Sequence, residues 1–345
     1  MQMKNETINT NAQASAFGWD FQCSLALYFV SMDFKKLARI KVEGPTEDIE
    51  LFYDNGHAIF IQSKAQLNPY SSSNTNAHLK NALKTLINAS QKTDYSQLYY
   101  GSNINNPFVL KEFSNLFNGG PTNYSFFELL PKIQDKITKY VNENAKKNKM
   151  LLNKFDYNRI RICTLPFYGD DDATRYRFIR DKVDIFLTDL DIRRPVINRV
   201  FDYYQLLFYK NPSKSVSLSK EELAWPIIIF SLDVDNERFY EDYEINLEEE
   251  DAIENKYQSF IESKTVDFAL ITNINTNYSK FITSKNYSTR KKIVEEFIDN
   301  YYEYFSEVIF PEKSDDITHA VTKLILWKIL KKNRTITTLR NEVGI

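Results

Sequence analysis

Three side chains of different chemistry are expected to meet where two strands of this chain pair. Asp48 opens one apolar run, and Gln62 and Lys64 end the next, with Asp54-Asn55-Gly56 between the runs. Asn-Gly between two such runs predicts a tight hairpin. Because side chains alternate along a strand, Gln62 and Lys64 share one face, beside the Asp48 end of the partner strand. A carboxylate, an amide oxygen and an ammonium group should therefore converge.

These groups are the ones that metal-assisted hydrolysis of a phosphodiester requires. A hard divalent cation is held by one or two carboxylate oxygens and a neutral oxygen, while water and phosphate fill the remaining positions. The cation lowers the pKa of the attacking water, and a nearby lysine stabilises the charge that develops. Taken singly, each residue can also be explained by structure alone. Asp48 would be a carboxylate at a strand edge, Gln62 a hydrogen-bonded amide in the core, and Lys64 the solvated end of a strand. Together they favour a site.

The elements that must position this site follow from hydrophobic periodicity. A helix beginning near Gly18 and running to Val30 precedes three short strands, and a second helix and a fourth strand come after them. This helix, strand, strand, strand, helix, strand order places the three side chains on adjoining strands. The strands are expected at 38–43, 48–53, 57–64 and 97–101, and the second helix at 78–92.

The rest of the chain continues with helices, one more strand and then helices alone. The strand is expected at 158–165 and the helices at 107–117, 126–147, 172–190, 218–231, 236–262, 286–309 and 316–332. Asn211-Pro-Ser-Lys-Ser215 has the composition of a linker. We therefore expect two domains, 1–212 with a mixed α/β fold and 213–345 built of helices.

Composition narrows the function classes further. The net charge is -2 over 345 residues, so attraction to polyanions must be local. Two distant cysteines, Cys23 and Cys163, exclude a disulfide scaffold and a structural zinc site. The sequence has no phosphate-binding glycine-rich loop, no secretory signal and no run of apolar residues as long as a membrane span. We expect a cytoplasmic protein without a membrane partner.

The motif residues resemble a known family. Glu43-x4-Asp48-Ile-Glu-Leu followed by Ile61-Gln-Ser-Lys64, after the helix start Gly18-Trp-Asp-Phe-Gln22, looks like the restriction-endonuclease-like PD-(D/E)XK fold. It is similar to the variant with Gln-x-Lys in the third motif. That variant occurs in bacterial antiphage effectors, namely the endonucleases of CBASS systems and the nuclease subunit of Lamassu systems. The resemblance covers about residues 16–103.

The resemblance implies roles for these residues. Asp48 would be the metal ligand for Mg²⁺ or Mn²⁺, Gln62 would replace the customary acidic ligand, and Lys64 would be the catalytic lysine. Gln22 and Glu43 would support the site from the first helix and first strand. Glu50, two residues beyond Asp48 on the same strand face, would be an additional ligand or the principal one, and Asp48 ranks first because the family pattern places its acid before a hydrophobic residue.

The implied function is cleavage of double-stranded DNA by a defence effector. Its partners would be an SMC-like ATPase and an accessory subunit, and the active form would be a homo-oligomer, because one site cuts one strand. Two alternatives stay open: a catalytically inactive interaction subunit with the nuclease fold, and a CBASS-type nuclease triggered by a nucleotide. Lys41, Lys80 and Lys84 are candidates for contacts with DNA phosphates, and each also reads as an ordinary surface lysine.

Overall fold

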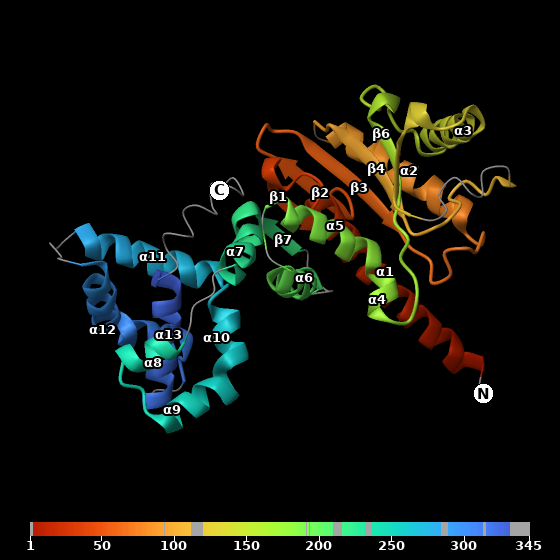
Figure 1. Ribbon diagram of the computed structural model, residues 1–345. Coiled ribbons are helices and arrows are strands. Elements are labelled where there is room, and N and C mark those ends of the chain that lie inside the picture. Colours follow the sequence, from red (N-terminus) through yellow and green to blue (C-terminus); the bar gives the residue numbers. More distant parts are fainter. Residues whose placement is uncertain are drawn as a thin grey trace. The chain divides into compact units, whose positions relative to one another are not determined.

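The computed structural model of this chain divides into two compact units, Met1–Lys220 and Glu221–Ile345 (Figure 1). The residues that the structure describes are 3–92, 94–111, 120–190, 192, 194–209, 216–231, 236–283, 289–312 and 315–331. Residue 212, where the sequence analysis ends the first domain, lies outside these ranges, as does most of the helix expected at 107–117.

In the described part of the first unit, seven strands form one mixed sheet in the order β5-β6-β4-β3-β2-β1-β7. Strands β3, β4 and β6 run parallel to one another, and the other neighbours pair antiparallel. The strands are β1 (Leu37–Val42), β2 (Ile49–Tyr53), β3 (Ala58–Lys64), β4 (Gln97–Ser102), β5 (Thr122–Ser125), β6 (Ile160–Thr164) and β7 (Val216–Ser219). The prediction of a mixed sheet is confirmed.

Helices cover both faces of this sheet, which confirms the expected α/β layering (Figure 1). α2 and α3 pack together over β3 and β4, and α1, α5 and α6 pack together on the other face. The helices of this unit are α1 (Met3–Val30), α2 (Thr75–Lys92), α3 (Pro131–Asn148), α4 (Asp172–Arg175), α5 (Arg177–Thr188) and α6 (Arg194–Tyr209). Among the described residues, short 3-10 turns at Phe34–Lys36, Phe126–Glu128 and Tyr157–Arg159 connect other elements.

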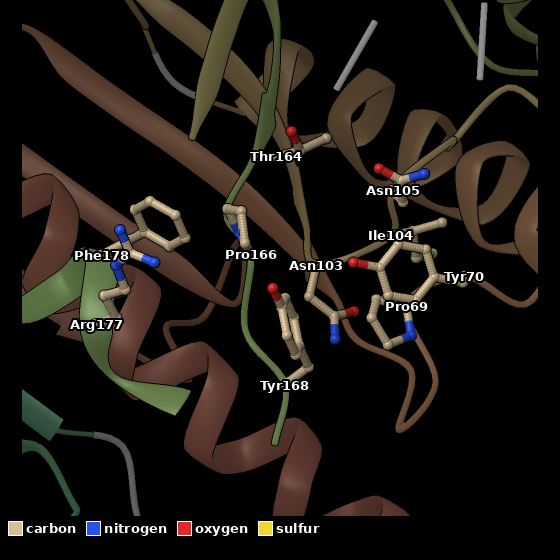
Figure 2. A pocket seen from close by; sticks show the side chains of 10 residues that line it. All are labelled: Pro69, Tyr70, Asn103, Ile104, Asn105, Thr164, Pro166, Tyr168, Arg177 and Phe178. Atoms are coloured by element: carbon tan, nitrogen blue, oxygen red, sulfur yellow. The ribbon is translucent and has the colours of Figure 1, made fainter. Parts of the chain in front are cut away.

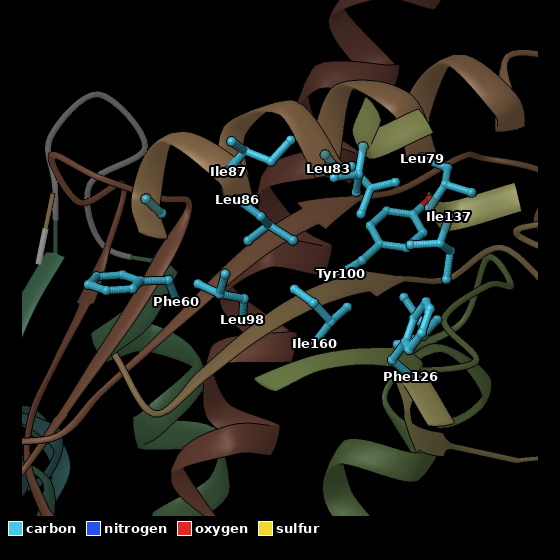
Figure 3. Close-up of a cluster of buried hydrophobic side chains, with 14 of the residues drawn as sticks. Phe60, Leu79, Leu83, Leu86, Ile87, Leu98, Tyr100, Phe126, Ile137 and Ile160 are labelled. Carbon is cyan, nitrogen blue, oxygen red and sulfur yellow. The ribbon is translucent and has the colours of Figure 1, made fainter. Parts of the chain in front are cut away.

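The core under α2 explains why the strands alternate as they do. Phe60, Leu98, Tyr100 and Ile160 project from the sheet, and Leu79, Leu83, Leu86 and Ile87 project from α2 to meet them (Figure 3). Full burial of each such side chain contributes about 1.5–3 kcal/mol. On the opposite face, a Cβ at Gly101 would lie 2.5 Å from Cδ2 of Leu25, so glycine allows α1 to approach β4.

The two turns beside β2 place the ends of the strands. The β2–β3 hairpin turns at Asp54-Asn55-Gly56, where Gly56 has φ +80° and its N–H donates to the carbonyl of Tyr53 over 3.0 Å. The hairpin prediction is therefore confirmed. In the β1–β2 turn, Glu43 adopts a left-handed conformation with φ +54°, and its N–H donates to the carbonyl of Asp48 over 2.8 Å.

Several elements differ from the sequence prediction. α1 begins at Met3 rather than near Gly18, and residues 12–16, which are exposed, continue the helix toward its start. β7 was expected as the start of a helix at 218; Val216-Ser-Leu-Ser219 instead pairs with β1 and completes that side of the sheet. β5 and α6 were not predicted, since a four-residue strand gives almost no periodic signal.

The second unit is helical throughout its described residues. Its helices are α7 (Lys220–Phe230, which begins at the last residue of the first unit), α8 (Glu237–Asp242), α9 (Leu247–Ala252), α10 (Gln258–Lys264), α11 (Phe268–Thr283), α12 (Arg290–Ile309) and α13 (Asp316–Lys331), with a π-helical turn at Ile253–Tyr257. α11 was missed because its asparagines and β-branched residues are poor helix formers. Among the described helices of the chain, none has the length and apolar character to cross a bilayer.

Candidate active site

The carboxylate of Asp48 is the centre of the candidate site. Asp48 lies just before β2, next to the Ile49–Ile61 register pair, so it sits opposite Gln62. Its Oδ2 accepts hydrogen bonds from Nε2 of Gln62, from the N–H of Ser63 at 2.8 Å and from Oγ of Ser63 at 3.1 Å. Nζ of Lys64 lies 3.7 Å from the same oxygen. The structure thus brings Asp48, Gln62 and Lys64 together.

The backbone of Asp48 is fixed from two sides. Its carbonyl oxygen accepts a hydrogen bond from Nε2 of Gln22 at 2.9 Å and another from the N–H of Glu43 at 2.8 Å. Gln22 is buried on α1, whereas the side chain of Glu43 is exposed. The first helix therefore contacts the site through an amide, and the β1–β2 turn contacts it through a backbone N–H.

The carboxylate of Glu50 holds the β1–β2 turn together. Its carboxyl group is buried, and its Oε1 accepts hydrogen bonds from the N–H of Thr46 at 2.7 Å and of Glu47 at 3.2 Å. These bonds close the β1–β2 turn, as a carboxylate does at a helix N-terminus. Of Asp48 and Glu50, it is Asp48 that meets Gln62 and Lys64.

The amide of Gln62 is held by α2. Its Oε1 accepts a hydrogen bond from Oγ1 of Thr85 at 2.6 Å, while its Nε2 faces Asp48. The amide therefore presents nitrogen to Asp48, and its role as an oxygen ligand requires the amide to turn. A hydroxyl can donate or accept, so Thr85 satisfies either orientation. Sequence reasoning missed Thr85, which carries no signal beyond its place on the buried side of an amphipathic helix.

Glu47 is a second carboxyl group in the site that sequence reasoning missed. Its side chain is 5% exposed, and within the described residues its Oε1 has no hydrogen-bond partner. Burial, followed by the negative charge of Asp48, raises the pKa of Glu47 to about 8, against smaller lowering effects of Thr85, Lys64 and Lys92. The charges and the hydroxyl that act on Glu47 thus come from the site residues Asp48 and Lys64 and from α2. Two consecutive acids before an apolar strand were the available signal.

The three lysines predicted to contact phosphates have different surroundings. Nζ of Lys80 lies 2.5 Å from Oε2 of Glu143 on α3, so its charge is already paired. Nζ of Lys41 lies 5.8 Å from the centre of the Phe52 ring. Lys84 is exposed on α2. Of the three, Lys84 presents its charge most directly to solvent.

A pocket of about 240 Å³ opens at the end of the parallel strands. Figure 2 shows Tyr168 with Tyr70 on one side and Arg177 on the other. Thr164, at the end of β6, lines this pocket. Lys64 pairs with Ser102 and Ser102 with Thr164 across the sheet, so Lys64 and Thr164 are roughly 10 Å apart, two strand spacings.

Few side chains in the candidate site could bind a metal ion. In the part of the chain that the structure describes, no three His, Cys, Asp or Glu side chains form a group suited to a metal ion. Two carboxyl groups, Asp48 and Glu47, and one amide, Gln62, are the oxygen donors present, which fits Mg²⁺ because that ion keeps several waters. Comparison with family models, curated proteins and solved structures found no match.

Proposed function

We propose that this chain hydrolyses phosphodiester bonds of DNA with the help of Mg²⁺ or Mn²⁺, as a restriction-endonuclease-like enzyme. The observation that carries the proposal is the convergence of Asp48, Gln62 and Lys64 on one end of the β2–β3 hairpin. A carboxylate that can hold a cation and an ammonium group beside it, both partly exposed where two central strands of the sheet end, match the chemistry of an anionic polymer substrate.

Each residue has a distinct task in this proposal. Asp48, with its Oδ2 fixed by Gln62 and Ser63, would hold the cation. The bound cation would lower the pKa of a water and neutralise charge on the phosphate. Lys64 is held 3.7 Å from Asp48 and would donate to a phosphate oxygen as negative charge develops, the preorganised electrostatic contribution that dominates many active sites.

The surroundings of the site suit a nucleic acid. The exposed Lys84 and Arg177 in the pocket provide positive charge on a chain whose net charge is only -2. Tyr70 and Tyr168, whose ring centres are 6.1 Å apart, offer aromatic surface beside that charge, a combination that binds unpaired bases and backbone. Salt-sensitive DNA binding of low sequence preference follows.

The biological setting of the proposal rests on the family resemblance. The chain would act as the effector of an antiphage or anti-plasmid complex of the Lamassu kind, cutting double-stranded DNA beside an SMC-like ATPase and an accessory subunit. The helical second unit would serve assembly, and the active form would be a homo-oligomer because a double-strand break requires two sites.

The test is degradation of plasmid DNA by the full chain with Mg²⁺ or Mn²⁺, with and without EDTA. Asp48→Asn and Lys64→Ala are each expected to lower the cleavage rate by at least about 100-fold. Lys154→Ala removes an exposed lysine outside the site and is the matched control. Equal rates for Lys64→Ala and wild type would overturn the proposal, and RNA supplied in parallel identifies the polymer that is cut.

A non-catalytic interaction subunit is the second candidate function. The amide at Gln62, whose oxygen is turned toward Thr85, is the observation that favours it, because an amide in place of a carboxylate weakens cation binding. Absence of cleavage by wild type, together with the same binding to partner proteins by wild type and Lys64→Ala, would establish this candidate.

A further inference from the structure

One oxygen of the site is left unsatisfied. Oε1 of Glu47 is buried and, among the described residues, accepts no hydrogen bond. Buried polar atoms of native proteins almost always have a partner, so an exception calls for an explanation. A carboxyl oxygen removed from water without a compensating contact destabilises the fold.

The neighbouring donors are already engaged. The hydroxyl of Thr85 donates to Oε1 of Gln62 at 2.6 Å or to the carbonyl of Ala82 at 2.9 Å. Nε2 of Gln62 and both donors of Ser63 are directed to Oδ2 of Asp48. Lys64 lies beside that same oxygen. The hydroxyl of Thr85 also acts on the Glu47 carboxyl group, yet Oε1 of Glu47 keeps no hydrogen-bond partner among the described residues.

Asp48 has a free oxygen as well. All of the hydrogen bonds to its carboxylate reach Oδ2, and within the ranges that the structure describes Oδ1 receives none. Glu47 and Asp48 are consecutive residues at the end of the β1–β2 turn, and the negative charge of Asp48 acts on Glu47. A divalent cation placed between these two carboxyl groups would be attracted to both.

We propose that Glu47 supplies the second anionic ligand of the divalent cation, together with Asp48, while Gln62 positions Asp48 by donating to its Oδ2. This inference rests on the proposed function, because it concerns the same cation. In this inference, Glu47 provides the negative charge that Gln62, an amide, cannot provide. Hard divalent cations favour carboxylate oxygens over amide oxygens of equal reach because the attraction is electrostatic.

The test measures binding of Mn²⁺ alone to the full chain, by calorimetry and by the electron paramagnetic resonance signal of free Mn²⁺. Glu47→Gln keeps the shape of the side chain and removes its charge, and it is expected to weaken Mn²⁺ binding by at least about tenfold. Asp48→Asn should weaken it similarly. Asp94→Asn removes one exposed carboxylate from the same unit and should bind Mn²⁺ as wild type does.

The outcomes separate this inference from the proposed function. If Glu47→Gln binds Mn²⁺ as wild type does while Asp48→Asn does not, Glu47 is not a ligand and the inference fails alone. If wild type does not bind Mn²⁺, or if both variants bind it unchanged, the cation site fails and the proposed function fails with it. Circular dichroism establishes folding of each variant, and Glu47→Ala replaces Glu47→Gln if the latter does not fold.

Discussion

At the scale of single residues, the site depends on hydrogen bonds that orient other side chains. Gln62 orients the carboxylate of Asp48, and Thr85 in turn orients Gln62 from α2. Such outer contacts decide whether a reacting group keeps its geometry during turnover. In the proposed function, Thr85 would be a positioning residue, which acts through the amide of Gln62 rather than on the substrate.

Thr85→Val tests this role with an isosteric change. Loss of the hydroxyl frees the amide of Gln62, and we expect the rate of DNA cleavage to fall by about tenfold with a stability loss of about 1–2 kcal/mol. The measurements are kcat and KM for cleavage and the urea midpoint. Thr85→Ser should restore the rate, since it keeps the hydroxyl. A Thr85→Val enzyme with wild-type kcat would show that the hydroxyl only stabilises the fold.

Residue types and strand alternation were sufficient to predict that Asp48, Gln62 and Lys64 would meet. Two of their neighbours were not predictable in this way. Glu47 belongs to a turn, where alternation says nothing about side-chain direction, and the turn geometry depends on the hydrogen bonds of the buried Glu50. Thr85 comes from a helix whose rotation over the sheet is fixed only by packing of the whole core.

At the scale of elements, α1 is tied to the segment before α5 by one buried carboxylate. Both oxygens of Asp20 accept from the hydroxyl of Tyr176 at 2.9 Å, and Nη1 of Arg175 lies 3.6 Å from Oδ2. Burial raises the pKa of Asp20 and outweighs the lowering effects of Tyr176 and Arg175. The folded state therefore favours the protonated form of Asp20 more than the unfolded chain does.

This shift makes the stability of the fold depend on pH. A carboxyl group with a raised pKa in the folded state contributes its full stability below the pKa of the unfolded chain, about 3.9. That contribution is lost as pH rises through the folded pKa. Asp20→Asn cannot ionise, so its free energy of unfolding relative to wild type should increase as pH rises from about 3.5 to 7.

Urea unfolding of wild type and Asp20→Asn across that pH range measures the effect. The exposed Asp94→Asn provides the control, with a difference from wild type expected to vary little with pH. A constant difference between Asp20→Asn and wild type would contradict the prediction, because the two proteins would then bind the same number of protons on unfolding.

Elements with strong periodicity were predicted well, and short or polar ones were not. β1 to β4, β6 and α2 follow clear apolar patterns and lie close to the predicted ranges. β7 has only two inward side chains, Val216 and Leu218, so its pairing with β1 is decided by tertiary contact. α11 is helical despite its asparagines because Leu270, Ile271 and Ile274 are buried along one side.

At the scale of the whole molecule, the end of the first unit can be tested by truncation. β7 pairs with β1 from Arg39–Ser219 to Val42–Val216, and Nζ of Lys220 donates to the carbonyl of Lys35 at 2.5 Å. A fragment ending at residue 220 keeps these contacts. A fragment ending at 212, the limit expected from sequence, loses them and exposes the edge of β1.

We expect fragment 1–220 to unfold in one cooperative transition and fragment 1–212 to melt at least roughly 5 °C lower, given the burial lost at Val216 and Leu218. Calorimetry of both fragments measures the difference. A third fragment, 1–220 with Leu218→Ser, separates the contribution of the buried side chain from that of the strand pairing. Equal melting temperatures for 1–212 and 1–220 would place the end of the folding unit before β7.

The exposure of Asp48 and Lys64 has a consequence for how such a protein could be kept silent. Their side chains retain 24% and 29% of their surface in contact with solvent, so bulk water already wets the groups that the reaction would use. Keeping the proposed activity off would then require another molecule to cover these two side chains. In the proposed function, a molecule bound over these two side chains would compete with the substrate, and its dissociation rate would set how fast the site becomes available.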